Sequence, residues 1–249
     1  MESRMRLLLG LGALSIISIV ASGLLAGCNS PTRTSPNAAT TYVLVTLKRG
    51  ERAAERTQEE RVTIQEQHLA NIRRLAHEGT LLAAGPYGKD NHDPASRGIF
   101  IFGVATLDEA TRLTNTDPAV IAGVLAMDGE LLTTGANLRA AIAAELAREA
   151  DEKARGIEPK MGEHIRPYAL VRTLRPTDAR RAIAHAAPHS ILIDGTTGDD
   201  RGFLIVDAKE TKSVREWLGE TFATDTTVDE WYASDLLILA RNGMWEVHP

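Results

Sequence analysis

The sequence predicts an α+β protein that folds the same six-element unit twice, in the βαββαβ order of ferredoxin-like domains. Two observations predict this class. Strand-like and helix-like hydrophobic periods alternate in that order from residue 42 onward. Short segments of the first half also return in the second: TLLAAG at 80–85 matches SILIDG at 190–195, and RGIFIFGV at 97–104 matches RGFLIVDA at 201–208. We interpret this repeat as an internal duplication.

Each element of the first half has a local signal. The segment 42–49 is β-rich, and 59–79 has apolar residues near helical spacing and ends at Gly79, a C-cap candidate. The other expected elements are a buried strand at 80–86 stopped by Gly-Pro, a strand at 97–105, a helix at 106–115 capped by Thr106, and a proline-marked turn leading into a strand over 117–132.

The second half repeats this order with a shorter connection between its middle strands. Its expected elements are a strand at 166–174, a helix at 176–188, strands at 190–195 and 201–208, a helix at 209–218 and a last strand at 228–241. Thirteen positions separate Gly85 from Gly98, whereas seven separate Gly195 from Gly202. The difference predicts a longer loop in the first half.

An Ala-rich helix is expected between the halves, at 136–156, closed by Gly156. Its thin apolar stripe favours packing on the rim of one half, and an amphipathic helix for a partner or a membrane is the alternative. The stripe consists of Leu138, Ile142, Leu146 and Ala150. We therefore expect a first domain at 42–135, a helical linker at 136–162 and a second, degenerate domain at 163–249.

A lone ferredoxin-like sheet has one face covered by its two helices and one face bare. Two copies in one chain can seal the bare faces against each other. The expected architecture is an intramolecular pseudo-dimeric α+β barrel, for which no further oligomer is required.

The N-terminus has the layout of a bacterial export signal. Arg4 and Arg6 precede an apolar run from 7 to 26, which leads directly into the segment LAGC. A transmembrane helix is the alternative, because about 20 apolar residues can just span a bilayer. The LAGC exit resembles the lipobox of bacterial lipoproteins, in which the cysteine is acylated. We expect a signal peptide at 1–27, lipidation of Cys28 and a polar, flexible tether at 28–41.

These features predict a lipid-anchored protein on the extracytoplasmic face of a bacterial membrane, in the cell envelope, with the bilayer as a partner. Cys28 is the only cysteine, so no thiol remains for redox or catalytic work. The net charge is −5, and it becomes −6 when the segment carrying Glu2, Arg4 and Arg6 is removed. A mildly acidic chain without a basic stripe argues against nucleic-acid binding.

Two segments of the first half resemble the YCII-related domain family, whose fold is related to that of muconolactone isomerase. QEQHLANIRRL, followed by GTLLAAGP, carries a helix histidine, and DPAVIAGV at 117–124 repeats the family's Asp-Pro with a Gly-Val after it. The resemblance covers roughly 42–133. It implies that His68 and Asp117 form an acid–base pair in a pocket between two sheets.

The chemistry of this pair is sensible, because a histidine can move a proton near neutral pH and a carboxylate fixes its tautomer. A structural alternative remains open at this stage. His68 could be an ordinary, partly buried helix histidine, and Asp117 could cap the turn that begins at Pro118.

The second half departs from the pattern of the family. Asp178 stands opposite His68, and Asp225 survives but is followed by Thr226 instead of proline. His185 and His189 are one helical turn apart, but Pro188 lies between them and no third ligand is evident. The sequence has no Gly-rich phosphate loop, nucleophile elbow or zinc spacing, and we expect no metal and no cofactor.

Two functions follow. The first is an envelope lipoprotein that binds a small ligand or a partner without well-defined catalysis. The alternative is a small enzyme of isomerase, lyase or hydrolase type that uses His68 and Asp117.

Overall fold

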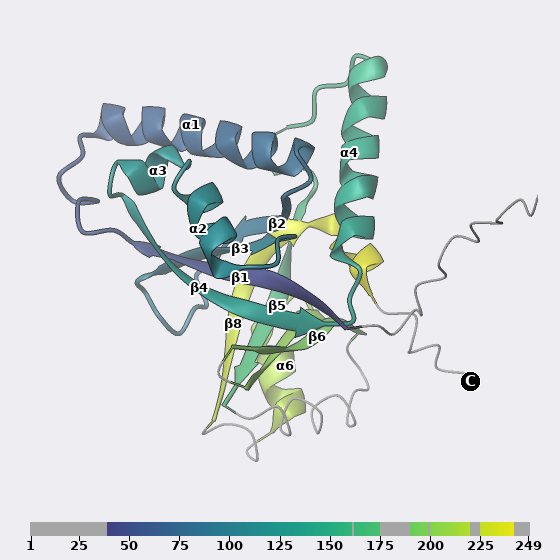
Figure 1. The fold of residues 1–249 in the computed structure, drawn as a ribbon. Coiled ribbons are helices and arrows are strands. Elements are labelled where there is room, and N and C mark those ends of the chain that lie inside the picture. The colour runs from purple at the N-terminus through teal and green to yellow at the C-terminus, as the bar shows by residue number, and fades with distance from the viewer. Residues whose placement is uncertain (1–38, 161, 175–189, 199, 220–224, 242–249) are drawn as a thin grey trace, which may run out of the picture. The chain divides into compact units, whose positions relative to one another are not determined.

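The computed structural model describes residues 39–160, 162–174, 190–198, 200–219 and 225–241. These residues form a mixed α+β structure around one antiparallel sheet of eight strands (Figure 1). The strand order is β2-β3-β1-β4-β6-β7-β5-β8. The order of the last four strands, β6-β7-β5-β8, repeats that of the first four.

The elements before residue 155 follow the expected order. They are β1 (Thr40–Arg49), α1 (Gln58–His77), β2 (Leu81–Pro86), β3 (Ser96–Phe102), α2 (Leu107–Thr114), the short α3 (Pro118–Ile121), β4 (Leu125–Thr134) and α4 (Leu138–Ala154). The predicted caps are confirmed: Thr106 Oγ accepts the amide hydrogen of Glu109, and Gly79 follows α1 with a φ of 72°.

The later elements are β5 (Ile165–Thr173), β6 (Ser190–Thr197), β7 (Arg201–Asp207), α6 (Thr211–Leu218), β8 (Thr226–Ser234) and the 3-10 helix η2 (Asp235–Ala240). The helix expected at 176–188 lies outside the described residues.

The expected strand at 228–241 is wrong beyond Ser234. The side chain of Ser234 accepts the amide hydrogen of Leu236, the chain turns into η2, and Leu237 and Ala240 are buried. The apolar run DLLILA is compatible with either a strand or a helical turn, so its composition could not separate the two.

One face of the sheet forms a single apolar core to which both parts of the chain contribute. We call it the central cluster; its largest members include Leu44, Ile101, Phe203, Ile205 and Trp231. The opposite face is covered separately, by α1 and α2 over the first four strands and by α6 over the last four (Figure 1). Strands that are buried on both faces require near-continuous apolar runs, such as YVLV at 42–45 and FLIV at 203–206.

Equivalent tyrosines of β1 and β5 anchor the two parts in the same way. Tyr42 and Tyr168 belong to the central cluster, and each hydroxyl donates to a backbone carbonyl at or just beyond the end of its neighbouring strand. Tyr42 bonds to Ala136 O at 3.1 Å, and Tyr168 bonds to Ser234 O at 2.7 Å. Burial raises the pKa of Tyr168 to about 12, so the hydroxyl stays a donor at neutral pH.

Two junctions join the first four strands to the last four. At one, β4 pairs with β6 from Leu132–Thr197 to Thr134–Gly195. At the other, Tyr87 and Trp231 form an isolated bridge just beyond β2, and the indole of Trp231 donates to Gly85 O at 3.0 Å. The sheet is therefore nearly closed into a barrel.

A glycine lies at each junction because a backbone carbonyl occupies the place of its side chain. A Cβ on Gly85 would lie 1.7 Å from Tyr232 O, and a Cβ on Gly195 would lie 2.6 Å from Thr133 O. Both glycines end the matched segments TLLAAG and SILIDG. The repeated glycine therefore has a physical cause, which is the close approach of the two parts.

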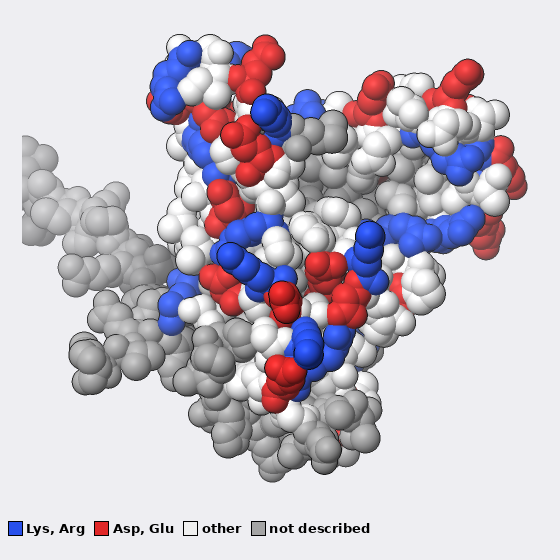
Figure 2. All heavy atoms as spheres, turned by 180° about the vertical axis from the view of Figure 1, so that it is seen from behind, with Lys and Arg blue, Asp and Glu red and all other residues white. Residues whose placement is uncertain are grey.

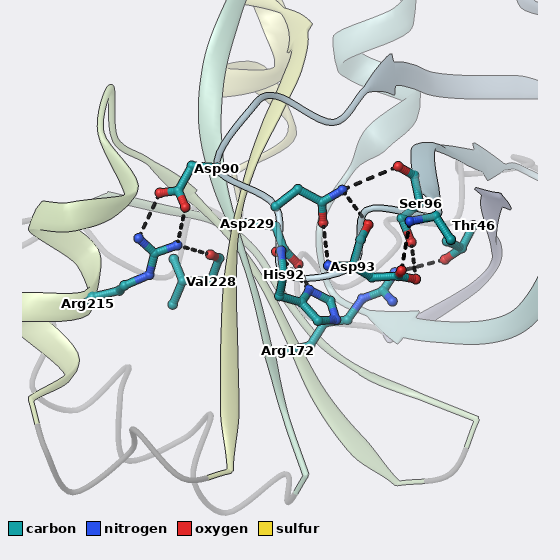
Figure 3. A network of polar contacts seen from close by, with 11 residues as sticks. Thr46, Asp90, His92, Asp93, Ser96, Arg172, Arg215, Val228 and Asp229 are labelled. Carbon is teal, nitrogen blue, oxygen red and sulfur yellow. Dashed lines mark hydrogen bonds and ion pairs between the residues drawn. The ribbon is translucent and has the colours of Figure 1, made fainter. Parts of the chain in front are cut away.

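The longer loop of the first half extends across the β2–β8 junction (Figure 3). Asp90 accepts two hydrogen bonds from the guanidinium of Arg215, at 2.7 and 2.9 Å, and Arg215 also donates to Val228 O. The Arg215 guanidinium lowers the pKa of Asp90. His92 bonds through its backbone N–H and its ring to the buried carboxylate of Asp229.

The helix α4 differs from its expected packing. Leu138 and Ala141 are buried in the central cluster with Ile142 packed against it, while Ala150 is exposed. The first turn of α4 thus contributes to the core that both parts share, in place of packing on the rim of one half.

We predict that Gly85→Ala destabilises the fold by about 1–3 kcal/mol, because its Cβ overpacks against the Tyr232 carbonyl. Gly129→Ala in β4 is the matched control, because its Cβ would have 3.5 Å to the nearest atom. Urea unfolding measures both. A Gly85→Ala variant as stable as Gly129→Ala would contradict the close approach.

Candidate functional site

His68 lies on the face of α1 that packs on the sheet. It is 9% exposed and shares this face with Asn71 and Leu75, at the spacing that one side of a helix requires. Its ring stacks on Phe100 of β3, with centroids 6.0 Å apart and planes inclined by 19°. The packing fixes the plane of the imidazole.

Asp117 lies between α2 and α3 and is fully buried. Its Oδ1 accepts the amide hydrogen of Ala119 at 2.8 Å, and its Oδ2 lies 2.7 Å from Nδ1 of His68. Pro118 occupies the first turn of α3, where its missing N–H costs no hydrogen bond. The structure thus brings the two expected site residues together, and Asp117 is also the helix cap that the alternative described.

The carboxylate determines which ring nitrogen of His68 carries the proton. An ionised Asp117 can only accept, so the hydrogen lies on Nδ1 when the imidazole is neutral. Nε2 is then an acceptor, and it has no hydrogen-bond partner among the residues that the structure describes. His68 is therefore arranged as a base whose free nitrogen points away from Asp117.

A polar contact holds the segment before Asp117 against α1. Nη2 of Arg74 donates to Asn71 Oδ1 at 2.8 Å and to Thr116 Oγ1 at 2.9 Å. Thr116 in turn donates to Leu113 O at 2.7 Å. These bonds join the end of α2 to α1 and so fix the distance between Asp117 and His68.

His68 lines a cavity of about 830 Å³. The cavity follows α1, passes over β2 and reaches α4 and β8, and its lining is mostly apolar. Side chains from both parts contribute, among them Leu69, Phe100 and Ala84 from the first and Tyr232 and Leu237 from the second.

The expected location of the pair, between two sheets, is wrong. The space between the bare faces is filled by the central cluster, whereas His68 stacks on Phe100, which belongs to the core under α1. Phe100 and Ile101 point to opposite faces of β3, as successive strand residues do. The cavity therefore opens on the helix-covered face and crosses the edge at β2.

Sequence reasoning missed a second histidine–aspartate pair. Nδ1 of His92 lies 2.8 Å from both carboxylate oxygens of Asp229, which is fully buried (Figure 3). Tyr87 lies near them, and burial raises its pKa to about 12. No local signal could have revealed this pair, because 137 positions separate its members.

Three arginines on the lining of the cavity were also missed: Arg49, Arg61 and Arg97. Arg97 begins the RG pair that returns as Arg201-Gly202. The repeated Arg-Gly pair helped to predict the strand β3, but it did not indicate that Arg97 lines a cavity.

The remaining expected positions give no second site. Asp178, His185 and His189 lie outside the described residues, and Asp225 accepts a backbone hydrogen bond from Leu174 through its carbonyl. Within the described ranges, no three His, Cys, Asp or Glu side chains are grouped to hold a metal ion. None of the helices in those ranges is both long and apolar enough to cross a membrane.

Residues 41–129 match the family model of the YCII-related domain. The match runs from β1 into β4 and includes both His68 and Asp117. A comparison with curated proteins gave no significant match. The chain thus contains a YCII-related domain, and residues 130–249 lie outside the match.

We predict that Asp117→Asn switches the tautomer of His68. The amide oxygen can keep the Ala119 cap while the amide nitrogen donates to Nδ1, which moves the ring hydrogen to Nε2. Long-range ¹H–¹⁵N correlation NMR of the neutral imidazole reports the tautomer. Asp108→Asn, on the exposed start of α2, is the control. An Nε2–H tautomer in the unmodified protein would contradict the site described above.

Proposed function

We propose that this protein binds a small molecule in the cavity under α1 and that His68 moves a proton on it. One observation carries the proposal. The fully buried Asp117 is hydrogen-bonded at 2.7 Å to Nδ1 of His68, and the ring of His68 lines the cavity. The YCII-related domain at 41–129 provides the setting but does not define a reaction.

In this proposal the two residues have different roles. His68 is the group that contacts the ligand and acts as a general base through Nε2. Asp117 is a positioning residue, which orients the imidazole and stabilises the imidazolium that forms. An apolar lining excludes water, which strengthens the attraction between the imidazolium and the carboxylate. Proton abstraction next to a carbonyl group is the reaction class that such a pair supports.

Binding without chemistry is the second candidate. The polar lining residues besides His68 are few, chiefly Gln65, Glu145, Tyr232 and Ser234 with the arginines. A reaction that needs a second proton donor would have to find it among these residues or in water. The apolar character of the cavity favours binding whether or not a reaction follows.

We also propose that the chain is a tandem of two ferredoxin-like halves. The repeated strand order, the glycine at each junction and the equivalent bonds of Tyr42 and Tyr168 support this duplication. In this proposal the second half has lost the histidine and serves to complete the barrel and one wall of the cavity.

The N-terminal motif supports a further proposal, that Cys28 is acylated and anchors the protein at the outer face of a bacterial membrane. The polar tether of residues 28–41 would then separate the barrel from the lipid. Bacteria fed an alkyne-labelled palmitate should label this protein in their membrane fraction. A Cys28→Ala variant that is still labelled would refute the anchor.

We predict that the protein catalyses hydrogen–deuterium exchange into a small carbonyl compound with an acidic α-hydrogen. ¹H NMR in D₂O, across a panel of such compounds, measures the exchange. His68→Gln should slow it by roughly 10²–10⁴-fold, the usual contribution of a general base.

His77→Gln is the control for this assay, because His77 lies on α1 and is half-exposed. It should exchange at the rate of the unmodified protein. If no compound exchanges, or if His68→Gln exchanges equally fast, the proton-transfer role is wrong and binding without chemistry remains.

A further inference from the structure

The charges on the cavity lining are not evenly distributed along it. Arg49, Arg61 and Arg97 all line the cavity, and Glu145 is its single acidic lining residue. The full chain is acidic, with a net charge of −5. A cavity lined by three arginines in an acidic protein is a local reversal of charge.

The topology places the three arginines at one end. Arg49 ends β1, and β3 pairs with that end of β1 through Leu47–Gly98 and Lys48–Ser96, which puts Arg97 beside it. Arg61 lies in the first turn of α1, which begins after the short connection from β1. These residues therefore lie together at the end of the cavity where α1 starts and β1 ends.

Glu145 lies at the opposite end, where α4 meets the end of α1. The two helices are linked there by His77 Nε2 and Glu149 Oε2, 3.1 Å apart. Lining residues on α1 run from Arg61 to Ala76, a distance of about 22 Å at 1.5 Å per residue. The cavity is therefore elongated, with three arginines at one end, a mostly apolar middle and Glu145 at the other end.

Figure 2 shows the surface on this side of the molecule. Between the charged surface over α4, at the upper left, and that over α1, at the upper right, the exposed atoms belong mostly to uncharged residues. The apolar lining residues of the cavity include Ile64, Leu69, Ile72 and Val124.

The arginines are available to a ligand. All three side chains are exposed, and the described carboxylates form ion pairs with none of them. Arg97 donates only to backbone carbonyls, and Arg61 makes one long bond to Thr57 O. An incoming carboxylate would therefore gain partners without breaking an existing ion pair.

We infer that the cavity takes an elongated amphiphilic carboxylate, such as a medium-chain fatty acid. The carboxylate lies among Arg49, Arg61 and Arg97, and the apolar chain passes His68 toward α4. Guanidinium groups match the geometry of a carboxylate, and burial of the chain supplies the larger part of the binding energy. This inference rests on the proposed binding of a small molecule by this cavity.

The test compares a fluorescent acid with its neutral ester. The probes are 11-(dansylamino)undecanoic acid and its methyl ester, titrated into the full chain. The acid should bind at least tenfold more tightly. Each single Arg→Gln variant should weaken acid binding by about 2- to 5-fold, as expected for exposed charges, and the triple variant by about tenfold or more.

Three controls accompany this titration. Binding of the methyl ester should be unchanged in the triple variant, which shows that the variant is folded. Arg112→Gln, on α2 outside the cavity, should leave both probes unaffected. Ala76→Phe fills the end of the cavity away from the arginines. It should weaken the displacement of the fluorescent acid by dodecanoate and leave its displacement by hexanoate unchanged.

Two results would overturn the inference. In the first, the acid and the ester bind equally well, and the triple variant binds both as the unmodified protein does. The cavity would then bind apolar ligands without recognising a carboxylate, and the proposed binding function would still hold. Failure of both probes to bind would exclude amphiphilic ligands. The proposed function would then depend on the isotope-exchange assay alone, which uses other compounds.

Discussion

The close approach of backbone to backbone at the two strand junctions is the constraint on which the rest of the structure depends. Gly85 faces the carbonyl of Tyr232, and Gly195 faces that of Thr133, at distances that leave no room for a side chain. At the first junction, Trp231 is buried in the central cluster and its indole donates to Gly85 O. Without this close approach, the apolar side chains of the central cluster would be exposed to water, at a large cost in free energy.

Closure of the sheet also builds the candidate site, although the histidine itself belongs to the first half. His68 and Asp117 are held by α1, α3 and Phe100, all of which lie within the matched domain. The far wall of the cavity comes from β8 and η2, which lie outside that domain. The matched residues 41–129 contain the pair, but they lack the side chains of β8 and η2 that line the cavity on that side.

The sequence predicted features that depend on residues close together in the chain. It did not predict contacts between residues that are far apart in the chain. Hydrophobic periods and caps predicted the strands and α1, and the resemblance to the YCII-related family implied that His68 and Asp117 form a pair. The apolar run at 235–240 was misassigned, because a strand and a 3-10 turn bury such residues equally well. The His92–Asp229 pair depends on folding of residues 137 positions apart, which no local pattern encodes.

Native-state hydrogen exchange at the β2–β8 junction tests the closed barrel most directly. The amide of Gly88 donates to Glu230 O at 2.8 Å, and the amide of Glu230 donates to Asp90 O at 2.7 Å. We expect both amides to be protected to nearly the same degree as those inside the β1–β3 ladder, because they open only when the barrel opens. Exchange at the rate of an exposed loop would contradict closure, and with it the shared wall of the cavity.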